Sequence, residues 1–259
     1  MDLKLDQLLK LAKKKLKEGS LSEAVSLYQD ILAKFPANKK AKNGLKAASN
    51  SPISKAQKNL DPPQNELEIL VELYSQGEFQ HGLSRTKASL EHFPNSIMLY
   101  NLLGAFYAGF KVYDEAIDSY TKALKINHNH AETHNNMGIT QRDSGNPDAA
   151  VDSFKNALRI KPNFTEAYNN MGNTLQDKGD LDEAIESYKQ ALKIKSNLAQ
   201  THNNIGNTLK KKSDLDAAIV SYQRALKIDP NYATAYSNLG QALQDKGDRD
   251  AALDSFRQA

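Results

Sequence analysis

Apolar and polar residues alternate along most of the chain with the period of helices that bury one face. The segment from 165 to 178 carries Tyr168, Met171 and Leu175 on one side of such a helix. After a turn at Gly179, a second segment of similar length repeats the pattern. The same outline returns earlier and later in the chain, so the sequence predicts antiparallel pairs of amphipathic helices.

The outline returns every 34 residues, a period typical of arrays of helical hairpins. Units begin at residues 63, 97, 131, 165, 199 and 233, and a position within a unit is called its column, with Thr165 in column 1. Column 8 is glycine in five units: Gly104, Gly138, Gly172, Gly206 and Gly240. Columns 20 and 24 are alanine and aromatic in the same units: Ala116, Ala150, Ala184, Ala218 and Ala252, and Tyr120, Phe154, Tyr188, Tyr222 and Phe256.

The recurring glycine needs a packing reason, because glycine inside a helix costs about 1 kcal/mol relative to alanine. We expect the glycine of column 8 and the alanine of column 20 to face each other, so that the two helices approach closely. Gly145, Gly179 and Gly247 stand in column 15, where a left-handed residue ends the first helix. Asn or Asp follows as the predicted N-cap of the second helix, and Asp180 and Glu183 have the spacing of a capping box.

These columns resemble the tetratricopeptide-repeat signature, most clearly at Tyr168, Met171, Gly172, Leu175, Ala184, Tyr188 and Ala191. The resemblance implies an all-α fold, a right-handed superhelical solenoid of antiparallel helix pairs. It also implies a concave face lined mainly by the first helix of each pair.

The repeats divide the chain into three parts. Residues 1–50 hold one basic repeat of this type and a short helix, 51–62 form a polar linker, and 63–259 form a six-repeat array. Within the array, 63–96 is degenerate and 233–259 is incomplete, so we expect a fragment of a longer protein. The uncapped last repeat should expose an apolar edge at Leu253 and Phe256, through which copies could associate end to end.

Composition fits an elongated array with a thin core, because only 39% of residues are hydrophobic and 25% are charged. The absence of Cys excludes disulfides and thiolate chemistry. No apolar run resembles a signal peptide or a membrane span, so we expect a cytoplasmic protein. Residues 1–60 carry a net charge of +8, which suggests a nucleic-acid or membrane adaptor as a weaker alternative. A solvated lysine face is favoured and no nucleic acid is expected, since no aromatic residues are interleaved for base stacking.

A row of carboxamides recurs in columns 5, 6 and 9, although Asn is a poor helix former. By resemblance, these columns face the concave groove, where a carboxamide can pair with both the N–H and the C=O of an extended peptide. The column 6 residues Asn136, Asn170, Asn204 and Asn238 resemble the asparagine ladder in the repeat arm of O-linked N-acetylglucosamine transferases. Bonding within each repeat, or simple solvation, is the alternative. The predicted peptide-binding residues are Asn101, Asn135, Asn136, Asn169, Asn170, Asn173, Asn203, Asn204, Asn207, Asn238 and Gln241.

The sequence therefore predicts a protein–protein interaction scaffold that holds an extended peptide of a partner protein in its groove. The alternative is a substrate-recognition arm of a larger enzyme, glycosyltransferase-like or another transferase, with a catalytic domain beyond Ala259. No catalytic residue, metal site or cofactor is expected in this chain itself. The cluster of His128, His130 and His134 could ligate zinc, but His134 fills the apolar column 4, which favours packing.

Overall fold

A computed structural model describes residues 5–18, 20–49 and 61–259, which form fifteen helices and no strand. Most of the predicted linker, residues 51–60, lies outside the described residues. The helices are α1 (Leu5–Lys17), α2 (Leu21–Lys34), α3 (Lys39–Ser49), α5 (Gln64–Ser75), α6 (Phe79–His92), α7 (Ile97–Gly109), α8 (Tyr113–Ile126), α9 (Ala131–Asp143), α10 (Pro147–Ile160), α11 (Thr165–Lys178), α12 (Leu181–Ile194), α13 (Ala199–Lys211), α14 (Leu215–Ile228), α15 (Ala233–Lys246) and α16 (Arg249–Gln258).

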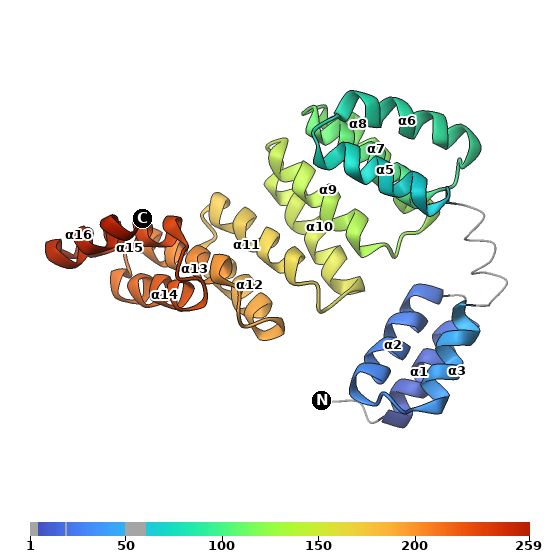
Figure 1. Ribbon diagram of the computed structural model, residues 1–259, viewed down its shortest axis with the longest axis horizontal. Helices are drawn as coiled ribbons and strands as arrows, with labels where there is room; N and C mark the ends of the chain where they lie inside the picture. The colour runs from blue at the N-terminus through green and yellow to red at the C-terminus, as the bar shows by residue number, and fades with distance from the viewer. Residues whose placement is uncertain (1–4, 19, 50–60) are drawn as a thin grey trace.

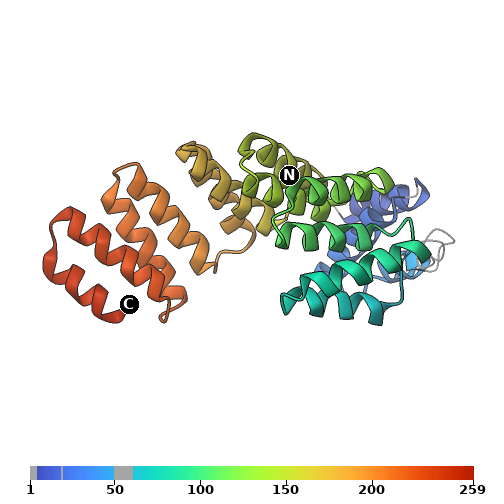
Figure 2. The ribbon, with the colours of Figure 1, turned by 90° about the horizontal axis from the view of Figure 1, so that it is seen from above.

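Helices α5 to α16 form six hairpins that follow one another along the molecule (Figures 1 and 2). The first helix of each hairpin is called the A helix and the second the B helix. Each B helix from α6 to α14 packs against its own A helix and against the A helix of the next hairpin. The predicted all-α solenoid of antiparallel helix pairs is therefore confirmed.

Helices α1, α2 and α3 form a bundle with a core of its own. Helices α1 and α2 make a hairpin, and α3 packs against both of them. Its buried residues are Ala12, Ala24, Tyr28, Ile31 and Ala41. The bundle thus consists of a hairpin followed by one more helix.

The turn between the A and B helices uses a left-handed residue at column 15 in every unit of the array. The glycines predicted there have φ angles of 84°, 89° and 96° at Gly145, Gly179 and Gly247. Lys111 and Ser213 adopt the same conformation, with φ of 60° and 64°, although a side chain is disfavoured there. The hairpin geometry therefore fixes this conformation even where the residue opposes it.

The predicted N-caps are correct in only some units. Asp214 and Asp248 accept hydrogen bonds from the N–H groups of Ala217 and Ala251, at 3.1 and 3.2 Å. The prediction is wrong for Asn146 and for the capping box of Asp180, because neither side chain makes a cap hydrogen bond. The backbone N–H of Asp180 instead bonds to Leu175 O at 2.9 Å, so the backbone turn itself closes the helix junction.

An aromatic ring from column 24 lies directly over the glycine of column 8 in each hairpin from α7 onward. A Cβ on Gly172 would stand 2.5 Å from Tyr188 Cε1, and one on Gly206 would stand 2.5 Å from Tyr222 Cε1. These distances are far below van der Waals contact, so the rings occupy the space that a side chain would need. The sequence predicts that the alanine of column 20 faces this glycine. The nearest atoms are instead those of the aromatic ring of column 24.

The degenerate first unit, α5 and α6, lacks the aromatic residue in column 24, and its glycine packs against a ring from the next hairpin. Its column 24 holds Thr86, which is buried and donates to Gly82 O at 2.7 Å. Phe106 from α7 fills the space, and a Cβ on Gly82 would lie 2.1 Å from Phe106 Cε1. The ring and the glycine thus come from neighbouring hairpins here.

Replacing Gly172 with alanine should lower the free energy of unfolding by about 1–3 kcal/mol, the usual cost of overpacking a core. Helix propensity alone predicts the opposite sign, because alanine is favoured over glycine by about 1 kcal/mol. Urea denaturation of the whole chain measures the difference. In a Tyr188→Leu background the alanine should cost less, since the two sites are coupled. A stability gain from Gly172→Ala alone would contradict the packing described here.

Candidate functional site

The A helices lie beside one another along the array, and each contacts the next from α5 to α15. Within the described residues, no two B helices make contacts of this extent. Because helices on the inner side of a curve lie closest together, the A helices line the inner face. Hydrogen bonds from columns 5, 6 and 9 run between neighbouring A helices, so the predicted carboxamides gather on and between them.

The column 5 amides lie deepest. Asn135 and Asn203 are only 7% and 3% exposed, and Asn101 and Asn169 are half-buried. Asn101 and Asn169 each donate from Nδ2 to a carbonyl of their own helix, four residues earlier, at 3.0 and 3.1 Å. A buried amide must be paired to be tolerated, so these side chains belong to the packing between repeats.

The partner of a column 5 amide depends on column 3 of the next unit. Where that residue is threonine, its hydroxyl meets the amide. Asn101 Nδ2 donates to Thr133 Oγ1 at 2.7 Å, and Thr201 Oγ1 donates to Asn169 Oδ1 at 2.8 Å. These bonds join α7 to α9 and α11 to α13.

Where column 3 is alanine, the column 6 asparagine of that unit supplies the bond. Asn170 Nδ2 donates to Asn135 Oδ1 at 3.0 Å, and Asn238 Nδ2 donates to Asn203 Oδ1 at 2.9 Å. Neighbouring A helices are thus joined by a side-chain hydrogen bond that is alternately between asparagine and threonine and between two asparagines. Sequence reasoning missed this role, although the alternation of threonine and alanine in column 3 is visible in the sequence.

The column 9 amides connect the A helices to the buried rings. Asn173 Oδ1 accepts hydrogen bonds from Tyr188 Oη at 2.7 Å and from Asn204 Nδ2 at 3.0 Å. Asn207 Oδ1 accepts from Tyr222 Oη at 2.8 Å. Gln241 is exposed. The two asparagines therefore satisfy the tyrosine hydroxyls above the glycines of column 8.

Column 6 keeps polar atoms available for a ligand. Asn170, Asn204 and Asn238 each use an N–H in the bonds between repeats, whereas their Oδ1 atoms have no partner within the described residues. Those oxygens are not buried, since Asn101 Oδ1 is the one buried side-chain polar atom without a partner in that part of the chain. Asn136 is also half-buried, and its Nδ2 makes no hydrogen bond within the same range.

His130 caps helix α9 and extends the polar contact between α7 and α9. Its Nδ1 accepts from the N–H of Thr133 at 3.3 Å and lies 2.7 Å from Thr133 Oγ1. Because Nδ1 accepts a hydrogen bond, the neutral ring carries its proton on Nε2. Burial lowers the pKa of His130, although the carboxylates of Glu132 and Asp61 oppose the shift.

The neighbouring histidines do not join His130 in a metal site. His134 Nε2 lies 3.1 Å from the carbonyl oxygen of His128, and burial lowers the pKa of His134. Within the described ranges, no three His, Asp or Glu side chains form a group that could hold a metal ion.

Two hollows lie on A-type helices at the columns that carry the carboxamides elsewhere. One, of about 1020 Å³, is lined mainly by α5 and by Met98 at the start of α7. The other, of about 630 Å³, lies between α1 and α3 and includes Lys10, Lys13 and Lys40. Neither hollow was predicted, because its lining residues lack the asparagine pattern.

Comparison with protein-family models identifies the repeats. A model described as TPR repeat matches residues 172–213 and 206–247, and two models described as Tetratricopeptide repeat match 95–163 and 153–186. Together these matches run from 95 to 247, more than half of the chain. The chain belongs to the tetratricopeptide-repeat family. A search of curated proteins found no match.

Solved structures share this tetratricopeptide-repeat fold. The crystal structure of MamA is 28% identical, with 60% of this chain and 91% of that chain covered and a TM-score of 0.56. PilW, described as a widely conserved type IV pilus biogenesis factor, is 19% identical over 76% and 93% of the two chains, with a TM-score of 0.69. YrrB, described as a TPR protein with an unusual peptide-binding site, is 22% identical over 77% and 99%, with a TM-score of 0.54.

Two further features of the surface bear on partners. Leu253 and Phe256 are 55% and 41% exposed, as expected for the outer edge of the last hairpin. Across the described residues, none of the helices has the length and apolar character needed to cross a membrane.

Replacing Asn203 with alanine should lower the free energy of unfolding by about 1–3 kcal/mol, because the N–H of Asn238 loses its acceptor. Alanine is the better helix former, so propensity alone predicts a gain. The matched control is Gln241→Ala on the exposed part of α15, which should change stability by no more than about 0.5 kcal/mol. Urea denaturation compares the two, and equal effects would show that the buried amide bond contributes nothing.

Stability should fall as the pH drops below about 6.5, the ordinary pKa of histidine in an unfolded chain. The pKa of His130 is lowered in the folded chain, so the unfolded state takes up its proton first and is favoured. The His130→Asn variant keeps a capping side chain that does not titrate. Its thermal midpoint should drop less between neutral and mildly acidic pH than that of the parent chain. An equal drop in the parent chain and in His130→Asn would refute the role of His130.

Proposed function

We propose that this chain is a protein–protein interaction scaffold that binds an extended segment of a partner along the inner face of its A helices. The observation that carries the proposal is the row of column 6 asparagines. Three of them direct an N–H toward the preceding A helix and keep a carbonyl oxygen that is not buried and has no partner among the described residues. Repetition at each hairpin aligns these oxygens along the array.

The spacing of the row suits a peptide backbone. Packed helices lie about 8–10 Å apart, and an extended chain advances about 3.3–3.6 Å per residue. Each repeat thus matches about three peptide residues. Amide oxygens that accept hydrogen bonds from peptide N–H groups hold the backbone with little regard to its side chains.

The roles of the predicted residues divide by column under this proposal. Column 6 provides the contacts with the peptide: Asn136, Asn170, Asn204 and Asn238. The buried column 5 amides and the column 9 asparagines fix the positions of the column 6 amides. Gln241, which is exposed, provides an additional polar contact on α15.

The peptide-binding site named in the description of YrrB supports a binding role for this fold, rather than catalysis. A substrate-recognition arm of a larger transferase would hold its substrate on the same row of amides. The binding experiment below therefore tests the step that both functions share.

Changing Asn136, Asn170, Asn204 and Asn238 together to alanine should weaken peptide binding by at least about tenfold, which corresponds to about 1.4 kcal/mol. The probe is a decapeptide selected from a random phage-displayed library on the full chain. Its affinity is measured by fluorescence anisotropy. Circular dichroism should show that the variant keeps its helices.

The matched control is the double variant Asn135→Ala and Asn203→Ala, which removes buried amides of column 5. This control should lose stability but lose less affinity for the decapeptide than the column 6 variant, because its column 6 oxygens remain although Asn170 and Asn238 lose the acceptors that position them. Unchanged affinity in the column 6 variant would exclude the row as the binding site.

A further inference from the structure

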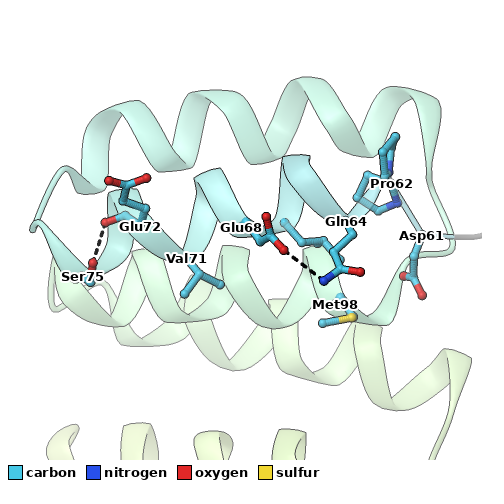
Figure 3. Close-up of a pocket in the computed structure, with 10 residues that line it drawn as sticks. Asp61, Pro62, Gln64, Glu68, Val71, Glu72, Ser75 and Met98 are labelled. Carbon is cyan, nitrogen blue, oxygen red and sulfur yellow. Dashed lines mark hydrogen bonds between the residues drawn. The ribbon is translucent and has the colours of Figure 1, made fainter.

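The hollow on α5 and α7 has an apolar floor that is open to solvent (Figure 3). Leu67, Val71 and Met98 form this floor, and Val71 and Met98 are 54% and 46% exposed. Leu67 and Val71 stand in columns 5 and 9, which are expected to face the inner groove, and Met98 lies beside them at the start of α7. The hollow therefore continues the row of asparagines toward the N-terminal end of the array.

Three carboxylates, those of Asp61, Glu68 and Glu72, line the hollow. Glu68 accepts a hydrogen bond from Gln64 at 3.0 Å, and Glu72 accepts one from Gln76 at 2.9 Å. Asp61 accepts from the hydroxyl of Ser96. Within the described residues, none of the three has a Lys, Arg or His partner at ion-pair distance.

Glu66, on the same helix, differs from these carboxylates because it is paired with a basic side chain. Glu66 receives two bonds from Arg85, at 2.8 and 2.6 Å, and the pKa of Glu66 is lowered chiefly by these contacts. Glu66 is thus joined to α6, whereas Glu68 and Glu72 line the hollow. Among the described residues, no basic side chain competes with a ligand for the carboxylates of Glu68 and Glu72.

We propose that this hollow binds the apolar side chains of a peptide in which they are flanked by lysine or arginine. The apolar side chains cover Leu67, Val71 and Met98, and the basic residues pair with the surrounding carboxylates. This inference rests on the proposed peptide-binding function and adds sequence preference to it. Column 6 of α7 is Leu102 rather than asparagine. At this end of the array the peptide is therefore held by its side chains rather than by its backbone.

The groove of the N-terminal bundle has the opposite charge at corresponding positions. Lys10, Lys13 and Lys40 line it, and none of them forms an ion pair within the described part of the chain. A basic peptide is therefore repelled by this groove and attracted by the hollow on α5. Because the two hollows have opposite charges, the bundle itself could occupy the hollow on α5 in place of a peptide. The test must distinguish these two occupants.

The test uses the full chain and a fluorescein-labelled peptide, Ser-Lys-Leu-Lys-Leu-Lys-Ser. Two matched peptides replace either its lysines by glutamate or its leucines by serine. The first peptide should bind at least about tenfold more tightly than either control. The double variant Glu68→Lys and Glu72→Lys, and separately Val71→Ser, should each weaken its binding several-fold. Because these side chains are on the surface, circular dichroism and the unfolding midpoint should change little.

The column 6 variant serves as a control that separates this inference from the proposed function. It should bind the short basic peptide as the parent chain does, even though it loses the selected decapeptide. Equal binding of all three peptides, or unchanged binding by the charge-reversed variant, would overturn the inference. A tenfold gain in affinity on changing Lys10, Lys13 and Lys40 to glutamine, which creates no acidic site for the peptide, would also overturn it, by showing that the bundle occupies the hollow.

Discussion

An aromatic ring packed over a helix glycine sets the distance between the two helices of each hairpin from α7 to α16. Because a Cβ on Gly172 or Gly206 would collide with the ring of Tyr188 or Tyr222, the A and B helices can approach this closely only with glycine in column 8. The same ring and glycine return every 34 residues, so successive hairpins have the same shape and stack in phase. This regular stacking is what brings columns of side chains on separate A helices into line. The tyrosine hydroxyls then reach Asn173 and Asn207, which ties the core to the polar inner face.

The inner face combines two tasks that the asparagine pattern alone does not distinguish. Column 5 amides are buried or half-buried and join neighbouring A helices. Asn170, Asn204 and Asn238 of column 6 make such a bond too, and each keeps an oxygen that has no partner among the described residues. The form of the bond depends on column 3, which alternates between threonine and alanine in four successive units: Thr133, Ala167, Thr201 and Ala235. The binding proposed at column 6 thus depends on residues that the peptide itself would not contact. The inner face of the array also changes chemistry along the chain, from an acidic and apolar hollow on α5 to carboxamides from α9 onward.

Much of this fold could be predicted from the sequence, because residues of the same type recur at the same packing positions of each repeat. The hairpins, the left-handed turns at Gly145, Gly179 and Gly247, and the buried rings all follow from period and residue type. The site could be predicted only as a set of columns. Whether an asparagine faces a ligand or a neighbouring helix depends on the distance between A helices, which one repeat does not reveal. Lys111 and Ser213 show the same limit, since only the hairpin geometry forces their positive φ. The hollow on α5 went unpredicted because Leu67 and Val71 look like ordinary core residues in the sequence.

The central claim is that aligned amides hold a peptide by its backbone, and its most direct test is to alter the backbone of a bound peptide. Each position of the selected decapeptide can be N-methylated in turn, which removes one N–H, and each can separately be changed to alanine. The account predicts that N-methylation disrupts binding at positions about three residues apart, while alanine has little effect over the same stretch. Strong losses from alanine at most positions, with N-methylation tolerated throughout, would contradict it.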